Sequence, residues 1–325
     1  MLDAAREAID QGKILEAIQL LKKILHLSHT NKAALELLSK IYLDCSQYKT
    51  CKNLLRFCIK HYPQETIFFR YRGILLCLTG NQKAGTKDLH TALSLDPGNI
   101  MVAHLLQAAS GDISKNTKPE YVEKLFDSYD HDFETSLTRL QYSGHQNLIS
   151  YVLQQIGIKF NTILDLGCGT GFVGEQIKEN LKYEKIIGID LSAQMLDKAY
   201  EKNIYIELHN MEIIDYLREN HPRNQYDLIV SADVFMYIGD LLELFIGVAQ
   251  NLTSDGYFAF TVENTSDNTD YSLDITGRFK HSNRYIINTL QKSHLELLCQ
   301  KSEILRYERG KPVFCCIYIA YVTKV

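Results

Sequence analysis

Two patterns of apolar and polar residues divide the chain. In the first part, a block of 34 residues recurs: Lys32–Glu65 and Thr66–Asn99 align, and each reads as two helices. Small residues at the eighth and twenty-seventh positions of each block let two antiparallel helices approach closely, while large apolar residues fill the seam between them. We therefore expect an all-α domain over residues 1–112, with about three helical pairs and a closing helix over Ile100–Ala109.

After the polar stretch Ser110–Pro119, which contains Gly and Pro as linkers do, short apolar runs alternate with single helices. This alternation predicts an α/β fold with a Rossmann-like, mostly parallel sheet covered on both faces. The tail reads instead as two strands joined by a tight turn, which predicts an antiparallel hairpin at one edge. We expect a second domain over residues 113–325, including a helical segment at 119–156. Its seven strands are expected at residues 162–166, 185–190, 205–208, 226–231, 257–263, 300–308 and 313–322, and its later helices at 171–180, 192–202, 213–220, 241–251 and 283–294.

The first of these strands runs into a glycine-rich turn, ILDLGCGTG at residues 163–171. Gly167, Gly169 and Gly171 lack side chains, so the backbone can lie against a ligand, and the helix that follows offers its free N–H groups. In open parallel sheets, ligands bind beyond the carboxyl ends of the strands. The turn therefore predicts a binding site for a nucleotide-like ligand.

Two cofactors can use such a turn. The segment 169–174 satisfies the dinucleotide pattern G-x-G-x-x-G, and Asp190 follows it at about the sequence separation expected of a residue that contacts the ribose. A nicotinamide dehydrogenase is therefore one possible function. Asp165 argues against it, because a carboxylate at the strand tip would repel a pyrophosphate and favour a ligand with an ammonium group. The alternative for Asp165 is a solvated turn residue, and the alternative for Asp190 is a cap of the next helix.

The motif Asp165-Leu166-Gly167-Cys168-Gly169-Thr170-Gly171 resembles that of class I S-adenosylmethionine-dependent methyltransferases, and the resemblance covers about residues 121–325. It implies that S-adenosylmethionine is the cofactor. It also implies transfer of a methyl group to an oxygen or nitrogen atom of a small-molecule or protein acceptor. Since the cofactor is already activated, the protein would contribute mainly alignment of the two reactants.

The resemblance implies contacts with successive parts of the cofactor at successive strand ends. Asp190 would bind the ribose, and Leu191, Met195, Glu212 and Ile213 would contact the adenine. Ala232 and Asp233 would contact the methionine end of the cofactor. The glycine motif would contribute Asp165, Gly167, Cys168, Gly169 and Gly171. Glu212 can equally be an ordinary acidic residue in the first turn of a helix.

The 34-residue blocks resemble tetratricopeptide repeats, although the usual tryptophan is missing. Such stacks commonly bind peptides, so a protein partner in the repeat groove is one possibility, and bracing of the second domain is the other. Together with FDSYDHDF at residues 126–133 and GRFKHS at 277–282, the repeats resemble a group of bacterial methyltransferases. Tyr129 is expected in a lid over the cofactor, although the aromatic residues of this stretch can equally pack in the core.

Between the fifth strand and the hairpin, the segment Asn264–Tyr285 is long and polar, and it lies at the ligand end of the sheet. Arg278 is a candidate to pair with a substrate carboxylate or phosphate. His281 is a candidate general base, because the pKa of histidine lies near neutrality. The alternative is that His281 and Ser282 only begin the following helix.

Composition narrows the function classes. Lys and Arg number 35 against 39 Asp and Glu, and the net charge of −4 offers no global attraction for nucleic acid or an anionic membrane. No secretory signal or apolar run of roughly 20 residues is present, so we expect a cytoplasmic protein. The eight cysteines lack metal-ligand spacing, so no metal is expected. A second hypothesis stays open, in which the chain is a repeat-based interaction scaffold with a non-catalytic methyltransferase-like domain.

Overall fold

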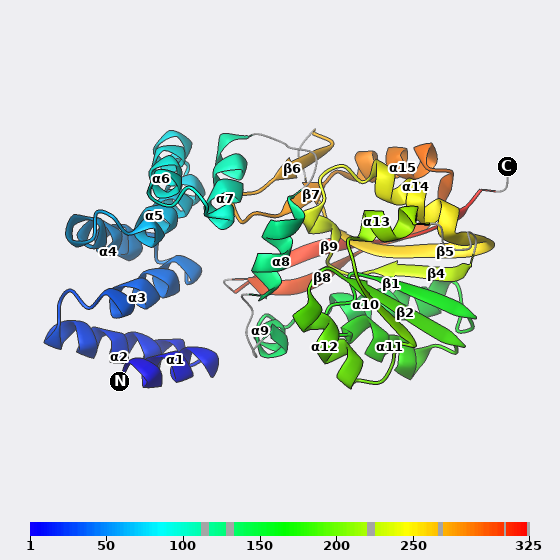
Figure 1. Ribbon diagram of the computed structural model, residues 1–325, viewed down its shortest axis with the longest axis horizontal. Coiled ribbons are helices and arrows are strands. Elements are labelled where there is room, and N and C mark those ends of the chain that lie inside the picture. The colour runs from blue at the N-terminus through cyan, green and yellow to red at the C-terminus, as the bar shows by residue number, and fades with distance from the viewer. Residues whose placement is uncertain (112–116, 128–132, 220–224, 266–268, 309, 324–325) are drawn as a thin grey trace. The chain divides into compact units, whose positions relative to one another are not determined.

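The computed structural model separates into two compact units, which are considered one at a time (Figure 1). The first contains Met1–Asp112 together with the short segment Asp274–Gly277, and the second contains Ile113–Leu273 and Arg278–Val325. The residues that the structure describes are 1–111, 117–127, 133–219, 225–265, 269–308 and 310–323.

The first unit is all-α, as the sequence predicts. Its helices recur regularly: α5 begins 34 residues after α3, and α6 begins 34 residues after α4. Three of the helices begin at asparagine caps, Asn31, Asn81 and Asn99, whose side chains accept a backbone N–H of the first turn. The helices are α1 Leu2–Asp10, α2 Ile14–Leu27, α3 Lys32–Asp44, α4 Tyr48–His61, α5 Thr66–Leu78, α6 Gln82–Leu95 and α7 Ile100–Ser110.

The second unit is built on a seven-stranded sheet with the order β3-β2-β1-β4-β5-β9-β8. Neighbouring strands are parallel from β3 to β5, whereas β9 runs antiparallel to both of its neighbours, β5 and β8. The prediction of a mostly parallel, Rossmann-like sheet closed by an antiparallel hairpin is thereby confirmed. The strands are β1 Thr162–Leu166, β2 Lys185–Asp190, β3 Glu207–Asn210, β4 Tyr226–Ser231, β5 Leu252–Glu263, β8 Leu295–Glu308 and β9 Lys311–Val322.

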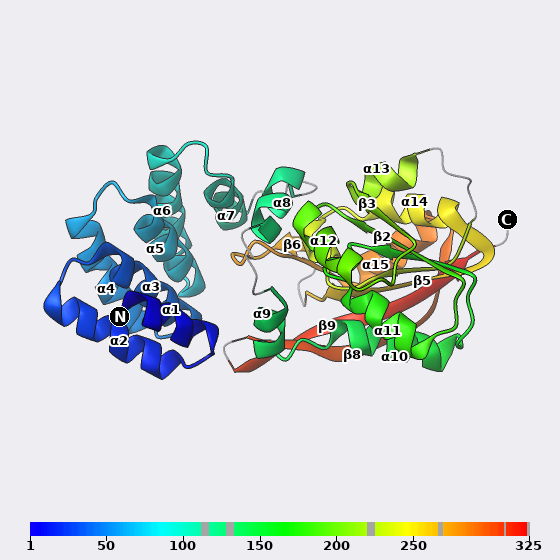
Figure 2. The same ribbon diagram turned by 60° about the horizontal axis from the view of Figure 1, so that its bottom comes forward.

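Helices cover both faces of this sheet (Figures 1 and 2). One buried cluster joins α10 and α11 to the sheet through Leu148, Val152 and Ile177, and the other joins α13, α14 and α15 through residues such as Phe245 and Ile286. The strands are buried on both sides because each face packs on a helical layer. The helices are α8 Pro119–Asp127, α9 Phe133–Arg139, α10 Gly144–Gln155, α11 Phe172–Asn180, α12 Ala193–Glu201, α13 Ile213–Arg218, α14 Leu242–Asn251 and α15 Asn283–Lys292.

Four elements differ from the expected pattern. The sixth strand, expected at residues 300–308, begins five residues earlier, at Leu295. The third strand begins two residues later than predicted, at Glu207, because Tyr205 before it is packed against the glycine turn. The fifth strand begins five residues earlier, at Leu252. The polar segment expected to be a loop contains a two-stranded hairpin, β6 Tyr271–Leu273 and β7 Phe279–His281. Within the described ranges, none of the helices combines the length and the apolar character that crossing a membrane requires.

Candidate active site

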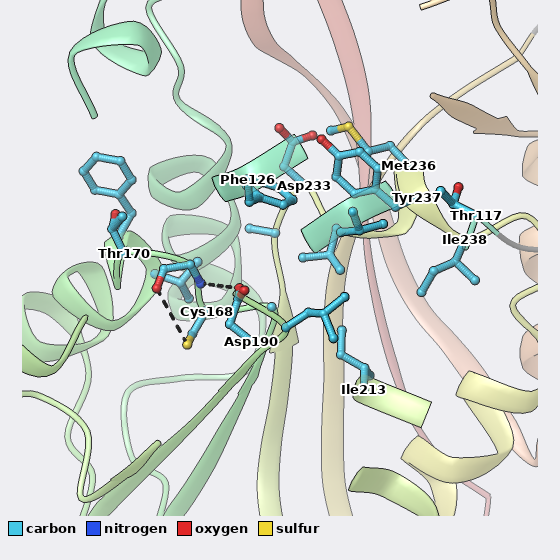
Figure 3. A pocket seen from close by; sticks show the side chains of 18 of the residues that line it. Thr117, Phe126, Cys168, Thr170, Asp190, Ile213, Asp233, Met236, Tyr237 and Ile238 are labelled. Carbon is cyan, nitrogen blue, oxygen red and sulfur yellow. Dashed lines mark hydrogen bonds between the residues drawn. The ribbon is translucent and has the colours of Figure 1, made fainter. Parts of the chain in front are cut away.

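A cavity of about 470 Å³ lies in the second unit, where β1, β2 and β4 end (Figure 3). The residues that directly follow these strands, Gly167, Leu191 and Ala232, all line it. The predicted site residues found in the lining are Gly167, Cys168, Gly169, Asp190, Leu191, Glu212, Ile213, Ala232, Asp233 and Arg278.

The glycine turn has the backbone conformation that its composition suggests. Gly167, Gly169 and Gly171 have φ values of +72°, +54° and +91°, in the left-handed region that side chains disfavour. A Cβ atom on Gly167 would lie 2.4 Å from Cγ2 of Val234, so any side chain at this position would clash with Val234. A Cβ atom on Gly169 would meet nothing within 4 Å, so the turn leaves open space at this lining residue.

Asp190, the last residue of β2, holds the turn in place. Its Oδ2 accepts the Gly169 N–H at 2.8 Å, and its Oδ1 accepts the Ser192 N–H at 2.9 Å. Burial raises the pKa of Asp190, while these backbone N–H groups oppose the rise. The side-chain cap of α12 is Ser192, whose Oγ accepts the Met195 N–H. Asp190 therefore combines a structural contact with a place in the cavity wall (Figure 3).

Glu212 caps the helix that follows β3. Its Oε2 accepts the N–H groups of Ile214 at 2.6 Å and Asp215 at 3.0 Å. The sequence suggested, as the alternative, an acidic residue in the first turn, whereas the structure places Glu212 one residue earlier, at the N-cap. Both Glu212 and Ile213 also line the cavity. Burial raises the pKa of Glu212, and the two backbone N–H groups oppose that rise.

Three residues of the implied cofactor site are not part of the cavity lining. Asp165 is fully buried, and its Oδ2 accepts a hydrogen bond from Tyr205 Oη at 2.7 Å. Burial raises the pKa of Asp165 to about 7. The expected direct contact of this carboxylate with the ligand does not fit that burial. Met195 is 2% exposed within α12, and Gly171 is the N-cap residue of α11.

A cluster of ionic residues from four parts of the chain adjoins the cavity, and its members Asp233, Arg278 and Arg306 line the wall. Arg306 of β8 is 2% exposed and pairs with Glu263 of β5 at 2.5 Å and with Glu308 at 2.6 Å. A third carboxylate, Asp233 after β4, lies 3.5 Å from Arg306 Nη1. Arg278, the predicted substrate-binding residue, pairs with Glu308 at 2.5 Å. Sequence reasoning missed Arg306 because nothing in an edge-strand pattern marks which charged residue faces inward.

His281 does not fit the predicted general base. Its side chain is fully buried at the end of β7 and is not in the cavity lining. Nε2 lies 2.9 Å from the carbonyl oxygen of Ile238 and 3.0 Å from that of Gly239, and burial lowers the pKa of His281 to about 4. Ser282 caps α15, as the alternative reading held. Tyr129 lies outside the described residues.

The helices before the first strand supply an aromatic and apolar wall. Phe126 of α8 packs edge-on against Tyr237, and both line the cavity. His145, at the start of α10, is stacked between Tyr142 and Phe172 with ring-centroid distances of 5.2 and 5.0 Å. Burial is the main reason why the pKa of His145 falls to about 4, which keeps this ring neutral at pH 7. The aromatic residues predicted for this stretch thus contribute to the cavity as well as to packing.

Residues 164–258 match the family model described as "Methyltransferase domain". The second unit therefore carries a methyltransferase domain. Malonyl-acyl-carrier-protein O-methyltransferase 1 of Ilyobacter polytropus is 33% identical to this chain over 100 residues, which are 30% of this chain and 37% of that relative. The chain thus spans little more than a third of this relative's length.

Solved structures of methyltransferases share the fold of this domain. A Haloferax volcanii methyltransferase solved in complex with the Trm112 methyltransferase activator has a TM-score of 0.52, with 14% identity, over 63% of this chain and 98% of its own. The 1,6-didemethyltoxoflavin-N1-methyltransferase of Burkholderia thailandensis, solved with 1,6-didemethyltoxoflavin and S-adenosylhomocysteine, has a TM-score of 0.50, with 14% identity, over 65% of this chain and 93% of its own.

The residues present suit S-adenosylmethionine better than a dinucleotide. The glycine turn leaves open space at Gly169, and the acidic residues Asp190 and Glu212 lie at neighbouring strand ends. A carboxylate can accept hydrogen bonds from ribose hydroxyls, whereas it repels phosphate. The cavity's arginines are themselves paired: Arg218 with Glu243, and Arg278 and Arg306 with Glu308. The lining therefore presents no unpaired cation to a pyrophosphate among the residues described.

Proposed function

We propose that the protein is an S-adenosylmethionine-dependent methyltransferase that acts on an oxygen or nitrogen atom of a small molecule. The observation that supports this most directly is the hydrogen bond between Gly169 N and Asp190 Oδ2 in the cavity wall, because it joins the open glycine turn to the acidic end of β2. The match of residues 164–258 to methyltransferase domains supports the same reading.

The chain's own residues would bind and align the reactants. S-adenosylmethionine, when bound, supplies a methyl group already activated on a sulfonium. Asp190 would accept hydrogen bonds from the ribose, and Glu212 with the Ile213 N–H would contact the adenine. Phe126 and Tyr237 would exclude water from the acceptor. Alignment of this kind can lower a barrier by about 7 to 11 kcal/mol.

We propose in addition that the first unit is a stack of tetratricopeptide repeats, with its boundary to the methyltransferase domain at about residue 112. The 34-residue spacing of its helices supports this. A peptide segment of a partner protein would bind in the groove of such a stack. The acceptor's small-molecule nature is supported by the apolar wall of the cavity, which suits a compact organic molecule.

Calorimetric titration with S-adenosylhomocysteine tests the cofactor site. We expect Asp190→Ala to weaken binding by about tenfold or more, because a charged hydrogen-bond acceptor is worth roughly 1.5 to 3 kcal/mol. The matched control is Asp197→Ala, which removes an exposed carboxylate of α12 outside the cavity lining and should bind as the wild type does. Unaltered binding by Asp190→Ala would place the site elsewhere. NADH, titrated in parallel, should produce no binding heat, and tight NADH binding would favour a dehydrogenase.

A further inference from the structure

Asp233 has an unusual backbone conformation beside the glycine turn. Its φ is +60°, which is uncommon for residues other than glycine. Its N–H donates to Thr261 Oγ1 at 2.8 Å, and the next residue, Val234, packs against Gly167. Because strained residues cluster where side chains must be aimed for function, this conformation suggests that the direction of the Asp233 carboxylate matters.

In the ionic cluster around Asp233, the positive and negative charges already balance when Asp233 is left out. Arg306 and Arg278 are matched by Glu263 and Glu308 at distances of 2.5 to 2.6 Å. Burial opposes ionisation of Glu308, but the two arginines hold its pKa down at about 2. Asp233 has only a loose contact, 3.5 Å from Arg306 Nη1, and that nitrogen is buried without a hydrogen-bond partner among the described residues. Asp233 is therefore the carboxylate of this cluster that is free to exchange a proton.

The sheet order puts Asp233 at one end of the cavity. Since β3, β2, β1 and β4 are neighbours in that order, the wall presents Glu212, Asp190, the glycine turn and Asp233 in sequence. Figure 3 shows Asp233 and Ile213 at different sides of the cavity. A cofactor with its adenine at Glu212 and its ribose at Asp190 would extend along this wall toward Asp233 after β4.

We propose that Asp233 is the catalytic base of the methyl transfer, and that the acceptor is a hydroxyl or amine that loses a proton. This inference rests on the proposed function. The acceptor's lone pair forms the bond to the methyl carbon while the carbon–sulfur bond breaks and its electron pair stays on sulfur. The acceptor's proton passes to the Asp233 carboxylate and later to solvent. Arg306, whose Nη1 lies 3.5 Å from Asp233 Oδ1, is a positioning residue.

A carboxylate acceptor fits this arrangement less well. It would need a cation to hold it, but both arginines are already engaged by Glu263 and Glu308, and Asp233 would repel it. A hydroxyl or an amine would instead donate a hydrogen bond to Asp233 and keep a lone pair for the attack. Burial raises the pKa of Asp233 to about 6, partly offset by Arg306 and Arg278, so the group is largely ionised at pH 7.5 and still basic enough to accept a proton.

Sinefungin is a suitable probe, because it carries an amine-bearing carbon where S-adenosylmethionine carries its methylsulfonium. Calorimetry would give the ratio of its affinity to that of S-adenosylhomocysteine. We expect the wild type to favour sinefungin by about tenfold at pH 7.5, because an ammonium group gains a charged hydrogen bond. Asp233→Asn should reduce the preference to about threefold or less. Asp197→Asn, which removes an equal charge from the exposed face of α12, should keep it.

The pH dependence of the wild type tests the same assignment without any variant. The charged and titratable groups that influence or face Asp233 are Arg306, Arg278, Glu263, Glu308, Tyr142 and Cys315. Since Asp233 becomes protonated as the pH falls through about 6, the preference for sinefungin should decline between pH 7.5 and pH 5. Equal affinities in the wild type at pH 7.5, or a preference that Asp233→Asn retains, would overturn the inference. If neither nucleoside binds, the proposed function itself fails.

Discussion

Tyr205 fills the space that glycines leave beside the turn. A Cβ atom on Gly174 would lie 2.5 Å from Tyr205 Oη, and one on Gly188 would lie 2.9 Å from Tyr205 Cδ1. The third glycine of the G-x-G-x-x-G pattern thus makes room for a tyrosine of the chain. The Tyr205 hydroxyl donates a hydrogen bond to Asp165 Oδ2 at 2.7 Å. This bond gives a partner to one oxygen of a carboxyl group that is fully buried.

This contact predicts a pH-dependent stability. Burial raises the pKa of Asp165 in the folded state to about 7, against about 3.9 when unfolded, so its ionisation costs stability as the pH rises from about 4 to about 7. Tyr205→Phe removes the donor that offsets this cost. We expect a loss of about 1 to 3 kcal/mol at pH 8 and a smaller loss at pH 5, where Asp165 is protonated.

Thermal melting at the two pH values measures that difference. Tyr200→Phe is the matched control, because Tyr200 is 75% exposed on α12 and its hydroxyl should contribute little. A destabilisation of Tyr205→Phe that is the same at pH 5 and pH 8 would argue that the hydroxyl does not interact with an ionised Asp165.

At the scale of single residues, the sequence predicts which residues line the cavity better than it predicts the partners of buried side chains. Asp190 and Asp233 could be assigned because the resemblance to class I methyltransferases implies contacts at the end of the second strand and after the fourth, and both residues line the cavity. His281 was misjudged, because a histidine in a polar segment has the same sequence whether it faces a ligand or two backbone carbonyls. Arg306 and Tyr205 act through partners far along the chain, which no local pattern reveals.

At the scale of elements, two helices of the first unit cross at glycines. A Cβ atom on Gly85 of α6 would lie 2.8 Å from the carbonyl oxygen of Gly73 on α5, and 2.3 Å from Cys77 Sγ. The backbones therefore approach more closely than side chains would permit. The sequence predicted a close approach at Gly73, the eighth residue of its block, but it did not mark Gly85 as the partner. The period of 34 residues gave the order of the helices.

Gly85→Ala should therefore be destabilising, although alanine favours helices. The added methyl meets backbone as well as the thiol, and overpacking of this kind costs about 1 to 3 kcal/mol. We expect the melting temperature of the first unit to fall by about 4 °C or more. Gly98→Ala is the control, because a Cβ atom there meets nothing within 4 Å. Equal melting temperatures for Gly85→Ala and the wild type would mean that the helices can separate without cost.

Element boundaries follow the sequence where a pattern ends at a turn. The helices after β1 and β2 lie within a residue of their predicted ends, because glycine and Ser192 mark their starts. The hairpin of β6 and β7 could not be predicted, since strands of three residues are too short to establish an alternation. The start of β5 at Leu252 was missed for a related reason: Ser254, Asp255 and Gly256 read as a turn but form part of the strand.

At the scale of the whole molecule, the position of the cavity indicates which unit binds the cofactor. Every lining residue in the described part of the chain falls between Thr117 and Arg306 and belongs to the second unit. The core of the first unit is formed by its own helices, with a buried cluster that runs from Ala5 to Leu75. Cofactor binding should therefore depend on the second unit.

Removing residues 1–112 tests this assignment. The remaining chain keeps the seven-stranded sheet and every cavity residue, so we expect it to bind S-adenosylhomocysteine within about twofold of the full-length affinity. Ligand binding should also raise its melting temperature, since a ligand that binds only the folded state stabilises it by roughly 2.7 kcal/mol at a hundredfold excess over Kd. The control is Asp190→Ala in the shortened chain, which should lose both effects. A folded but non-binding fragment would mean that the repeats help to form the cofactor site, and the units could then no longer be assigned separate roles.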